Sequence, residues 1–215
     1  MRSPVLRDTH RWGDRRRAGA SAMLGGLLWV PYGVFEMVQP WGDDTVYRDA
    51  RGYEVVTDAG LYWLYSLPGS IALAMSAWGL LGVLVVLGLR ARLGRLSAYA
   101  ALALALLSLV GLLIQFDPLF TAPRIFGTLA LGVATLLAGV DARRRGSTRD
   151  WAAMLLALGL LGLFLLPLWP LVFAIEVLPE GGGAMIIALF GFGWLWVGYR
   201  LGFRARAAHR SLPER

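Results

Sequence analysis

The residues best suited to chemistry in this sequence are two glutamates that stand in apolar surroundings, Glu36 and Glu176. A tryptophan precedes each of them by seven residues, Trp29 and Trp169. Two carboxylates that lie close together either share a proton or hold a cation between them. The pattern therefore predicts a site that binds a proton, a cation or a small solute.

The segment around Glu36 shows which way this glutamate faces. On a helix, its small and polar residues fall within one stripe: Ala18, Ala22, Gly25, Gly26, Trp29, Tyr32, Gly33 and Glu36. The other side carries Leu24, Leu27, Leu28, Pro31, Val34 and Phe35. Membrane helices turn small and polar residues to other helices and large aliphatic residues to lipid. We therefore expect Glu36 to face the other helices.

A third polar residue, Gln115, precedes a proline in the same way as the two glutamates do. We expect an outward-facing polar vestibule, lined by Trp29, Tyr32, Glu36, Gln115, Trp169 and Glu176. Both glutamates lie near predicted helix ends, however, and Trp and Tyr at that depth also form the usual aromatic belt of membrane proteins. The residues alone leave vestibule and belt as alternatives.

The composition determines which elements must position these residues. Of 215 residues, 57% are hydrophobic and 16% are charged, whereas soluble domains carry about 25% charged residues. The charges are clustered, and apolar stretches of about 18 residues or more are typical of membrane-spanning helices. The sequence predicts an all-α, polytopic membrane protein with six transmembrane helices. The predicted spans are 18–38, 61–89, 96–116, 124–140, 151–178 and 184–203.

The distribution of arginines tests the number of predicted spans, because short cytoplasmic loops retain an excess of positive residues. Arginines are concentrated before the first span, after the second, after the fourth and after the sixth, and only Arg48, Arg51 and Arg124 fall on the other side. Both termini are therefore predicted in the cytoplasm, with the protein in the plasma membrane, as in a bacterial inner membrane. This divides the chain into a basic cytoplasmic segment, 1–17, a transmembrane domain, 18–203, and a basic cytoplasmic tail, 204–215.

One outer loop, 39–60, is long. Within it, 45–48 and 53–56 alternate in the manner of strands and flank a turn that contains Gly52. This pattern predicts a small β-hairpin, with a solvated outer loop as the alternative.

Related patterns recur along the chain and suggest an internal repeat. Ile71-Ala72-Leu73 with Trp78 and Gly82 has the same spacing as Ile187-Ala188-Leu189 with Trp194 and Gly198. Together with the two Trp–Glu patterns, and a fainter middle copy at Gln115, this predicts three helix hairpins in a pseudo-threefold arrangement. Chance matches in a Leu- and Ala-rich sequence are the alternative.

Several kinds of chemistry lack the residues that they need. The chain has no cysteine and no lysine, and both histidines, His10 and His209, lie in the terminal segments. Thiolate metal sites, Schiff bases and an intramembrane bis-histidine haem are therefore excluded. The serines of the spans lack an intramembrane histidine or lysine base. We expect no cofactor, no metal site and no enzymatic activity, and the arginine clusters next to apolar spans indicate membrane orientation rather than nucleic-acid binding.

Six helices, a first helix rich in small residues and an outer lid-like loop make the chain similar in general architecture to the membrane-embedded substrate-binding subunits of energy-coupling-factor vitamin transporters. That resemblance implies binding of a small solute from the outer side. The alternative function is a non-catalytic partner or assembly subunit that acts through helix packing. Its motivation is a set of small residues that could contact another membrane protein, Ala18, Ala22, Gly198 and Gly202.

Overall fold

The computed structural model describes residues 4–38, 46–48, 54–56, 59–145, 149–164 and 184–202. The described part is helical except for two short strands and the turns. Its helices are α1 (Pro4–Val38), α2 (Ala59–Val86), α3 (Arg92–Leu113), α4 (Asp117–Arg144), α5 (Arg149–Phe164) and α7 (Ala184–Gly202).

Five of these helices, α1, α2, α3, α4 and α7, are long and apolar enough to cross a bilayer. The protein is therefore a polytopic helical membrane protein, as the sequence predicts. The fifth predicted span, 151–178, is described only up to residue 164, where it forms the shorter apolar helix α5. The remainder of that span lies outside the described residues.

The starts of α1 and α4 differ most from the predicted spans. Helix α1 begins at Pro4 rather than at residue 18, so part of the basic N-terminal segment continues the helix beyond its apolar span of Arg15–Phe35. Helix α4 begins at Asp117 rather than at Arg124. A proline at the first helical positions, here Pro118, has no N–H to leave unpaired and favours this earlier start. As a result, Arg124 lies almost two turns inside α4.

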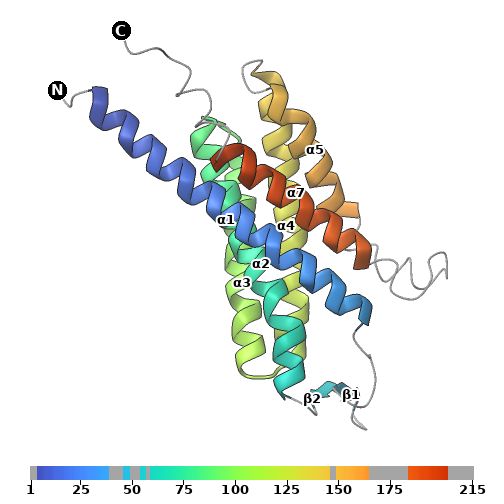
Figure 1. Ribbon diagram of the computed structural model, residues 1–215. Coiled ribbons are helices and arrows are strands. Elements are labelled where there is room, and N and C mark those ends of the chain that lie inside the picture. The colour runs from blue at the N-terminus through green and yellow to red at the C-terminus, as the bar shows by residue number, and fades with distance from the viewer. Residues whose placement is uncertain are drawn as a thin grey trace.

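The predicted β-hairpin is confirmed. Strands β1 (Val46–Arg48) and β2 (Glu54–Val56) pair antiparallel, with Val46 opposite Val56 and Arg48 opposite Glu54. This hairpin connects α1 to α2 and marks one end of the molecule, which we call the hairpin end (Figure 1). The other end, where α1 begins and where α2 meets α3 near Arg90, Arg92 and Arg95, is called the arginine-rich end.

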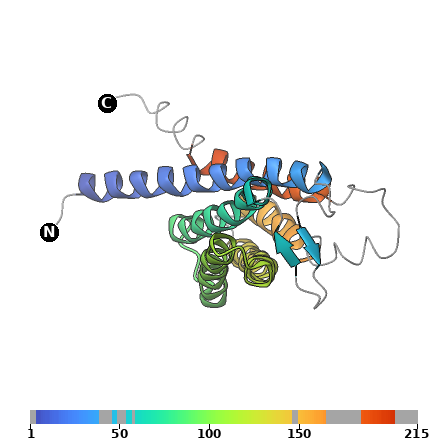
Figure 2. The ribbon, with the colours of Figure 1, turned by 90° about the horizontal axis from the view of Figure 1, so that it is seen from below.

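The helices form two layers. Helices α2, α3, α4 and α5 stand side by side, and α1 and α7 cross them obliquely as an antiparallel pair on one face (Figures 1 and 2). The main packing contacts join α1 to α7 and α2, α3 to α4, and α4 to α5. Near the arginine-rich end, Arg200 of α7 donates a hydrogen bond to the Asp150 carbonyl at 3.0 Å, which ties α7 to the start of α5.

Small residues allow these helices to approach closely. A Cβ atom added to Gly26 would meet the Gly191 carbonyl of α7 at 2.5 Å, and one on Gly79 would meet Ala22 at 2.9 Å. The residues that we considered for contact with another protein are used within the chain in the same way. Ala18 and Ala22 are buried against α2, and Gly198 lies against Gly19 and Met23 of α1. Gly202 is half-buried and adjoins Gly19, so these small residues take part in packing within the chain. Their contact with another membrane protein stays a prediction.

The described helices do not pack as three equivalent hairpins. Helix α1 packs along α2 and α3 along α4, but α7 packs mainly along α1 and touches α5 at few points. The two tryptophans that the repeat makes equivalent also differ, because Trp78 is 56% exposed and Trp194 is fully buried. Matching sequence spacing therefore does not produce matching environments, and the structure gives the pseudo-threefold arrangement no support.

Candidate functional site

The predicted stripe of α1 is buried, as expected. Ala18, Ala22 and the glycines at 25, 26 and 33 are covered by neighbouring helices, while Leu24, Leu27 and Val34 are exposed on the other side. In a membrane protein this exposed side faces lipid. The stripe therefore places Trp29 and Tyr32 inside the bundle.

Trp29 and Tyr32 lie together in the half of α1 nearer the hairpin end. Their exposed fractions are 1% and 3%, and their ring centroids are 5.8 Å apart in an edge-to-face arrangement. The Trp29 indole N–H donates a hydrogen bond to Ser76 Oγ of α2 at 3.1 Å. Both rings are thus embedded between helices rather than displayed at the surface.

The sequence analysis missed the positive charge beside Tyr32. The guanidinium carbon of Arg124 lies 5.1 Å from the centroid of the Tyr32 ring and 4.4 Å from that of Phe120. Phe120 precedes Arg124 by one helical turn in α4, so both side chains reach the same face. Arg124 is partly buried, and cation–π contacts contribute about 0.5–2 kcal/mol, more as the cation is desolvated. Pro118, which favours a helix start, was the sequence signal that could have placed Arg124 inside the helix.

A chain of hydroxyl groups connects the same region across α2, α3 and α4. Ser70 Oγ and Ser108 Oγ are hydrogen bonded at 2.8 Å, and Ser108 donates to the Phe120 carbonyl at 2.9 Å. Gly69, next to Ser70, lets the Tyr32 ring approach α2, since an added Cβ would lie 2.9 Å from that ring. Side chains from four helices therefore fix the positions of Tyr32 and Phe120 around Arg124.

Prolines are found inside three helices of this region, at Pro31 of α1, Pro68 of α2 and Pro123 of α4. Each one removes a backbone N–H and leaves a carbonyl group of the preceding turn without its helical partner. At membrane depth such carbonyls are tolerated only against protein or a water-filled cavity. All three prolines lie in the halves of their helices nearer the hairpin end.

The other predicted site residues divide into two groups. Gln115 forms the turn between α3 and α4 with a positive φ of 54°, and its side chain is exposed, so it stands apart from Trp29 and Tyr32. Trp169 and Glu176 lie outside the described residues. Glu36 belongs to α1 and follows Tyr32 by one turn, but its side chain is also outside the described set.

An aromatic row continues from Trp29 into α7. The ring centroids of Trp29 and Phe190 are 5.4 Å apart, and those of Phe190 and Trp194 are 6.1 Å apart. Among the side chains that the structure describes, the Trp194 indole N–H is buried without a hydrogen-bond partner. Leaving such a group unpaired costs about 1–3 kcal/mol. The row therefore ends in a donor that is available to another polar group.

In chemical terms, the cluster contains one cation and two aromatic faces, with a pair of hydrogen-bonded serine hydroxyls behind Phe120. The unpaired Trp194 N–H lies at the far end of the aromatic row, in α7. Within the described ranges, no three histidine, aspartate or glutamate side chains come close enough to share a metal ion. These groups can recognise a polar solute by charge and hydrogen bonding.

The fold and this cluster define a multi-pass helical membrane protein with a polar, arginine-containing region near one end of the bundle. Comparison with protein-family models, curated proteins and solved structures found no match to this chain. The architectural similarity to vitamin-transporter subunits is therefore not confirmed.

Proposed function

We propose that this protein binds, and possesses the architecture to transport, a small polar solute or cation at the hairpin end of the bundle. The observation that carries the proposal is the position of Arg124, held between the Tyr32 and Phe120 rings inside the apolar part of α4. Ionisable residues within membrane spans are costly, and they are usually retained for binding or transport.

The charges suggest which solutes the region would accept. Arg124 supplies a positive group to carboxylates or phosphates, which its planar guanidinium binds in a bidentate manner. Glu36, one turn beyond Tyr32 on α1, and Glu176 would supply negative groups. A site with both signs favours a solute that carries both charges, such as an amino acid, over a bare monovalent cation. Trp29, from inside the bundle, and Trp169 would complete the vestibule that the sequence predicts, whereas Gln115, exposed in the turn between α3 and α4, stands apart from it.

The membrane orientation proposed from the sequence is consistent with a site for a solute that arrives from outside the cell. An arginine-rich end in the cytoplasm places the hairpin end, and with it Tyr32 and Arg124, on the outer side. We propose a plasma-membrane location on the same basis. Impermeant thiol reagents test the orientation in intact cells, because the chain has no cysteine of its own. A cysteine at Thr45 should react, and one at Ser147 should react only after permeabilisation; the reverse pattern would overturn the orientation.

Cross-linking tests whether the two glutamates share one cavity. In the cysteine-free background, Glu36→Cys is combined with Glu176→Cys, and membranes are oxidised mildly. A disulfide requires Cα atoms within about 7 Å. The matched control combines Glu176→Cys with Val34→Cys, because Val34 is exposed on the other side of α1 at nearly the same depth. We expect a disulfide in the first pair only, and labelling without any cross-link would count against a shared site.

A binding assay tests the solute itself. The purified protein is heated in detergent with glutamate, glycine, phosphate, choline or sodium, and the midpoint of unfolding is followed. We expect a charged solute to raise the midpoint of the native chain but not that of Arg124→Gln or Glu36→Gln. No shift with any solute, together with unreactive cysteines at positions 36 and 176, would refute the proposal.

The second candidate function is a non-catalytic partner or assembly subunit that acts through helix packing. The small residues considered for such a contact also pack within the chain, which leaves less of their surface for a partner. Co-purification of a larger membrane protein in stoichiometric amount remains the observation that would favour it.

A further inference from the structure

A groove on the outside of the bundle lies between α1, α2 and α3, near the arginine-rich end. Its volume is about 270 Å³, and it is lined by Arg17, Ala18, Trp78, Leu81, Gly82, Val85 and Tyr99. The groove is separate from the Arg124 cluster, because its residues belong to the opposite halves of α1 and α2.

The floor of the groove exists because two small residues meet there. A Cβ atom on Gly82 would overlap the Ala18 side chain, so α1 and α2 are in backbone contact at this point. The side chains that form the walls of the groove are mostly large and exposed. Trp78, Val85 and Tyr99 are 56%, 65% and 58% exposed. Because all three lie in helices that span the membrane, their exposed surfaces face the lipid.

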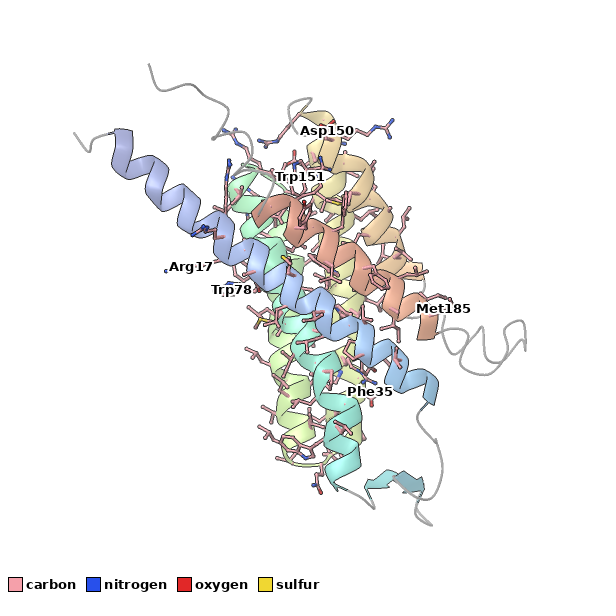
Figure 3. All side chains as sticks on the ribbon, viewed as in Figure 1. Arg17, Phe35, Trp78, Asp150, Trp151 and Met185 are labelled. Carbon is pink, nitrogen blue, oxygen red and sulfur yellow. The ribbon has the colours of Figure 1, made fainter. Side chains whose placement is uncertain are left out.

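The positions of Arg17 and Trp78 along their helices show how deep in the membrane the groove lies. Arg17 lies near the start of the α1 span, at the level where the apolar segment begins. Trp78 precedes the end of the α2 span by eight residues, which corresponds to about 12 Å along the helix. Tryptophans of the interfacial belt lie at the headgroup level, so Trp78 is deeper than a belt residue. Figure 3 shows Arg17 and Trp78 on the same flank of α1.

We propose that this groove binds an anionic phospholipid of the leaflet at the arginine-rich end. Arg17 would contact the phosphate group, and Val85, one residue before the end of the α2 span, would lie beside the glycerol region. An acyl chain would lie on Leu81 and on the rings of Trp78 and Tyr99, which are deeper in the membrane. The charge of the groove is complementary to such a lipid, since its single charged residue is an arginine and the same end carries Arg15 and Arg16.

A lipid suits the groove better than a partner helix does. Its lining combines one arginine with apolar and aromatic side chains, which matches a charged headgroup that continues into an acyl chain. A second groove on the other side of α1, which includes Arg16, Met23 and Leu195, is larger, at about 500 Å³, but has no aromatic side chain in its lining. The proposal therefore concerns the Arg17 groove.

Native mass spectrometry of the purified full chain tests the proposal, with phosphatidylglycerol and phosphatidylcholine as probes. We expect the native chain to retain phosphatidylglycerol in preference to phosphatidylcholine. Arg17→Gln should weaken phosphatidylglycerol retention about fivefold, the effect of one arginine near a membrane phosphate. Arg144→Gln is the matched control, because Arg144 is an exposed residue at the same end that does not line the groove.

A second variant tests the shape of the groove without changing charge. Val85→Trp fills the groove from its exposed wall, and Val110→Trp places the same bulk on an exposed part of α3 outside it. We expect loss of bound lipid in the first variant only. Equal retention of both lipids by the native chain would overturn the proposal. An equal loss of bound phosphatidylglycerol in Arg17→Gln and Arg144→Gln would overturn it too. Photo-cross-linking from position 99 to a protein instead of to a lipid would overturn it as well.

Discussion

Asp141 of α4 accepts a hydrogen bond from the backbone N–H of Arg90 at 2.6 Å, and this contact fixes the turn between α2 and α3 to the end of α4. Arg145 adds two further contacts, and we call the contacts among Asp141, Arg90, Arg145 and Gly88 the Asp141 clamp. Its Nε atom lies 3.2 Å from Asp141 Oδ1, and its Nη1 atom donates to the Gly88 carbonyl at 2.6 Å. Gly88 has a positive φ of 64°, a conformation that glycine adopts without strain. One carboxylate therefore organises the turn of another helix pair.

The clamp predicts the effect of Asp141→Asn. Loss of the negative charge weakens the bond to Arg90 and removes the ion pair with Arg145. Hydrogen bonds to charged groups contribute about 1.5–3 kcal/mol, and partial exposure lowers this, so we expect a loss of about 1–2 kcal/mol. Thermal unfolding in detergent measures it. The control is Asp150→Asn, an exposed aspartate at the start of α5, and equal losses in both variants would contradict the role of the clamp.

The two glycines of the Gly198-x-x-x-Gly202 motif should respond differently to alanine. A Cβ atom at 198 would lie 2.4 Å from Met23 Cγ and 2.5 Å from the Gly19 carbonyl, whereas one at 202 would meet Gly19 Cα only at 4.0 Å. We expect Gly198→Ala to destabilise the α1–α7 pair by about 1–3 kcal/mol, as overpacking does. Gly202→Ala should be nearly neutral. Unfolding midpoints of both variants give the comparison, and similar midpoints would show that α7 does not pack on α1 as described.

The hydrogen bond between Trp29 and Ser76 predicts a coupling that a double-mutant cycle detects. Ser76→Ala leaves the buried indole N–H unpaired, at a cost of about 1 kcal/mol in a membrane interior. Trp29→Phe should cost more because it also opens a cavity. With Phe at position 29, Ser76→Ala should cost less than it does alone. Ser97→Ala, which removes a single bond to the Ala130 carbonyl, is a control that should show no coupling to Trp29.

The contact between Arg124 and Phe120 makes a prediction that is independent of any solute. Phe120→Leu removes the ring 4.4 Å from the guanidinium while keeping most of the apolar volume. We expect a coupling energy of about 1 kcal/mol between Phe120→Leu and Arg124→Gln in unfolding experiments. Pairing Arg144→Gln with Phe120→Leu is the control. If the losses of unfolding free energy in Phe120→Leu and Arg124→Gln were strictly additive, Arg124 would not be held by the Phe120 ring.

Much of the helical framework could be predicted from the sequence, because burial in lipid requires long apolar helices with satisfied backbones. The stripe from Ala18 to Tyr32 identified the packed face of α1, since small and polar residues avoid lipid. The internal repeat in the sequence was less informative about which residues are buried. Trp78 and Trp194 share their spacing to neighbouring residues, yet one faces lipid and the other is buried, because spacing along a helix does not determine which neighbour packs against it.

The candidate site depended more on tertiary structure. The sequence indicated Trp29 and Tyr32, but it placed Arg124 at the first position of the fourth span and gave no reason to connect Asp141 with Arg90. Both relationships join helices that are distant in sequence, Tyr32 with Arg124 and Arg90 with Asp141.

By itself, then, the sequence determined that the chain spans a membrane and which face of its first helix is packed. These properties follow from local hydropathy and helical periodicity. Only the tertiary structure decided that α7 lies along α1, that Arg124 lies between Tyr32 and Phe120, and that a groove opens beside Arg17. The physical reason is that helix partners in a bilayer are selected by shape, through close contacts such as that between Gly26 and Gly191, and apolar residues of similar hydropathy do not encode that choice locally.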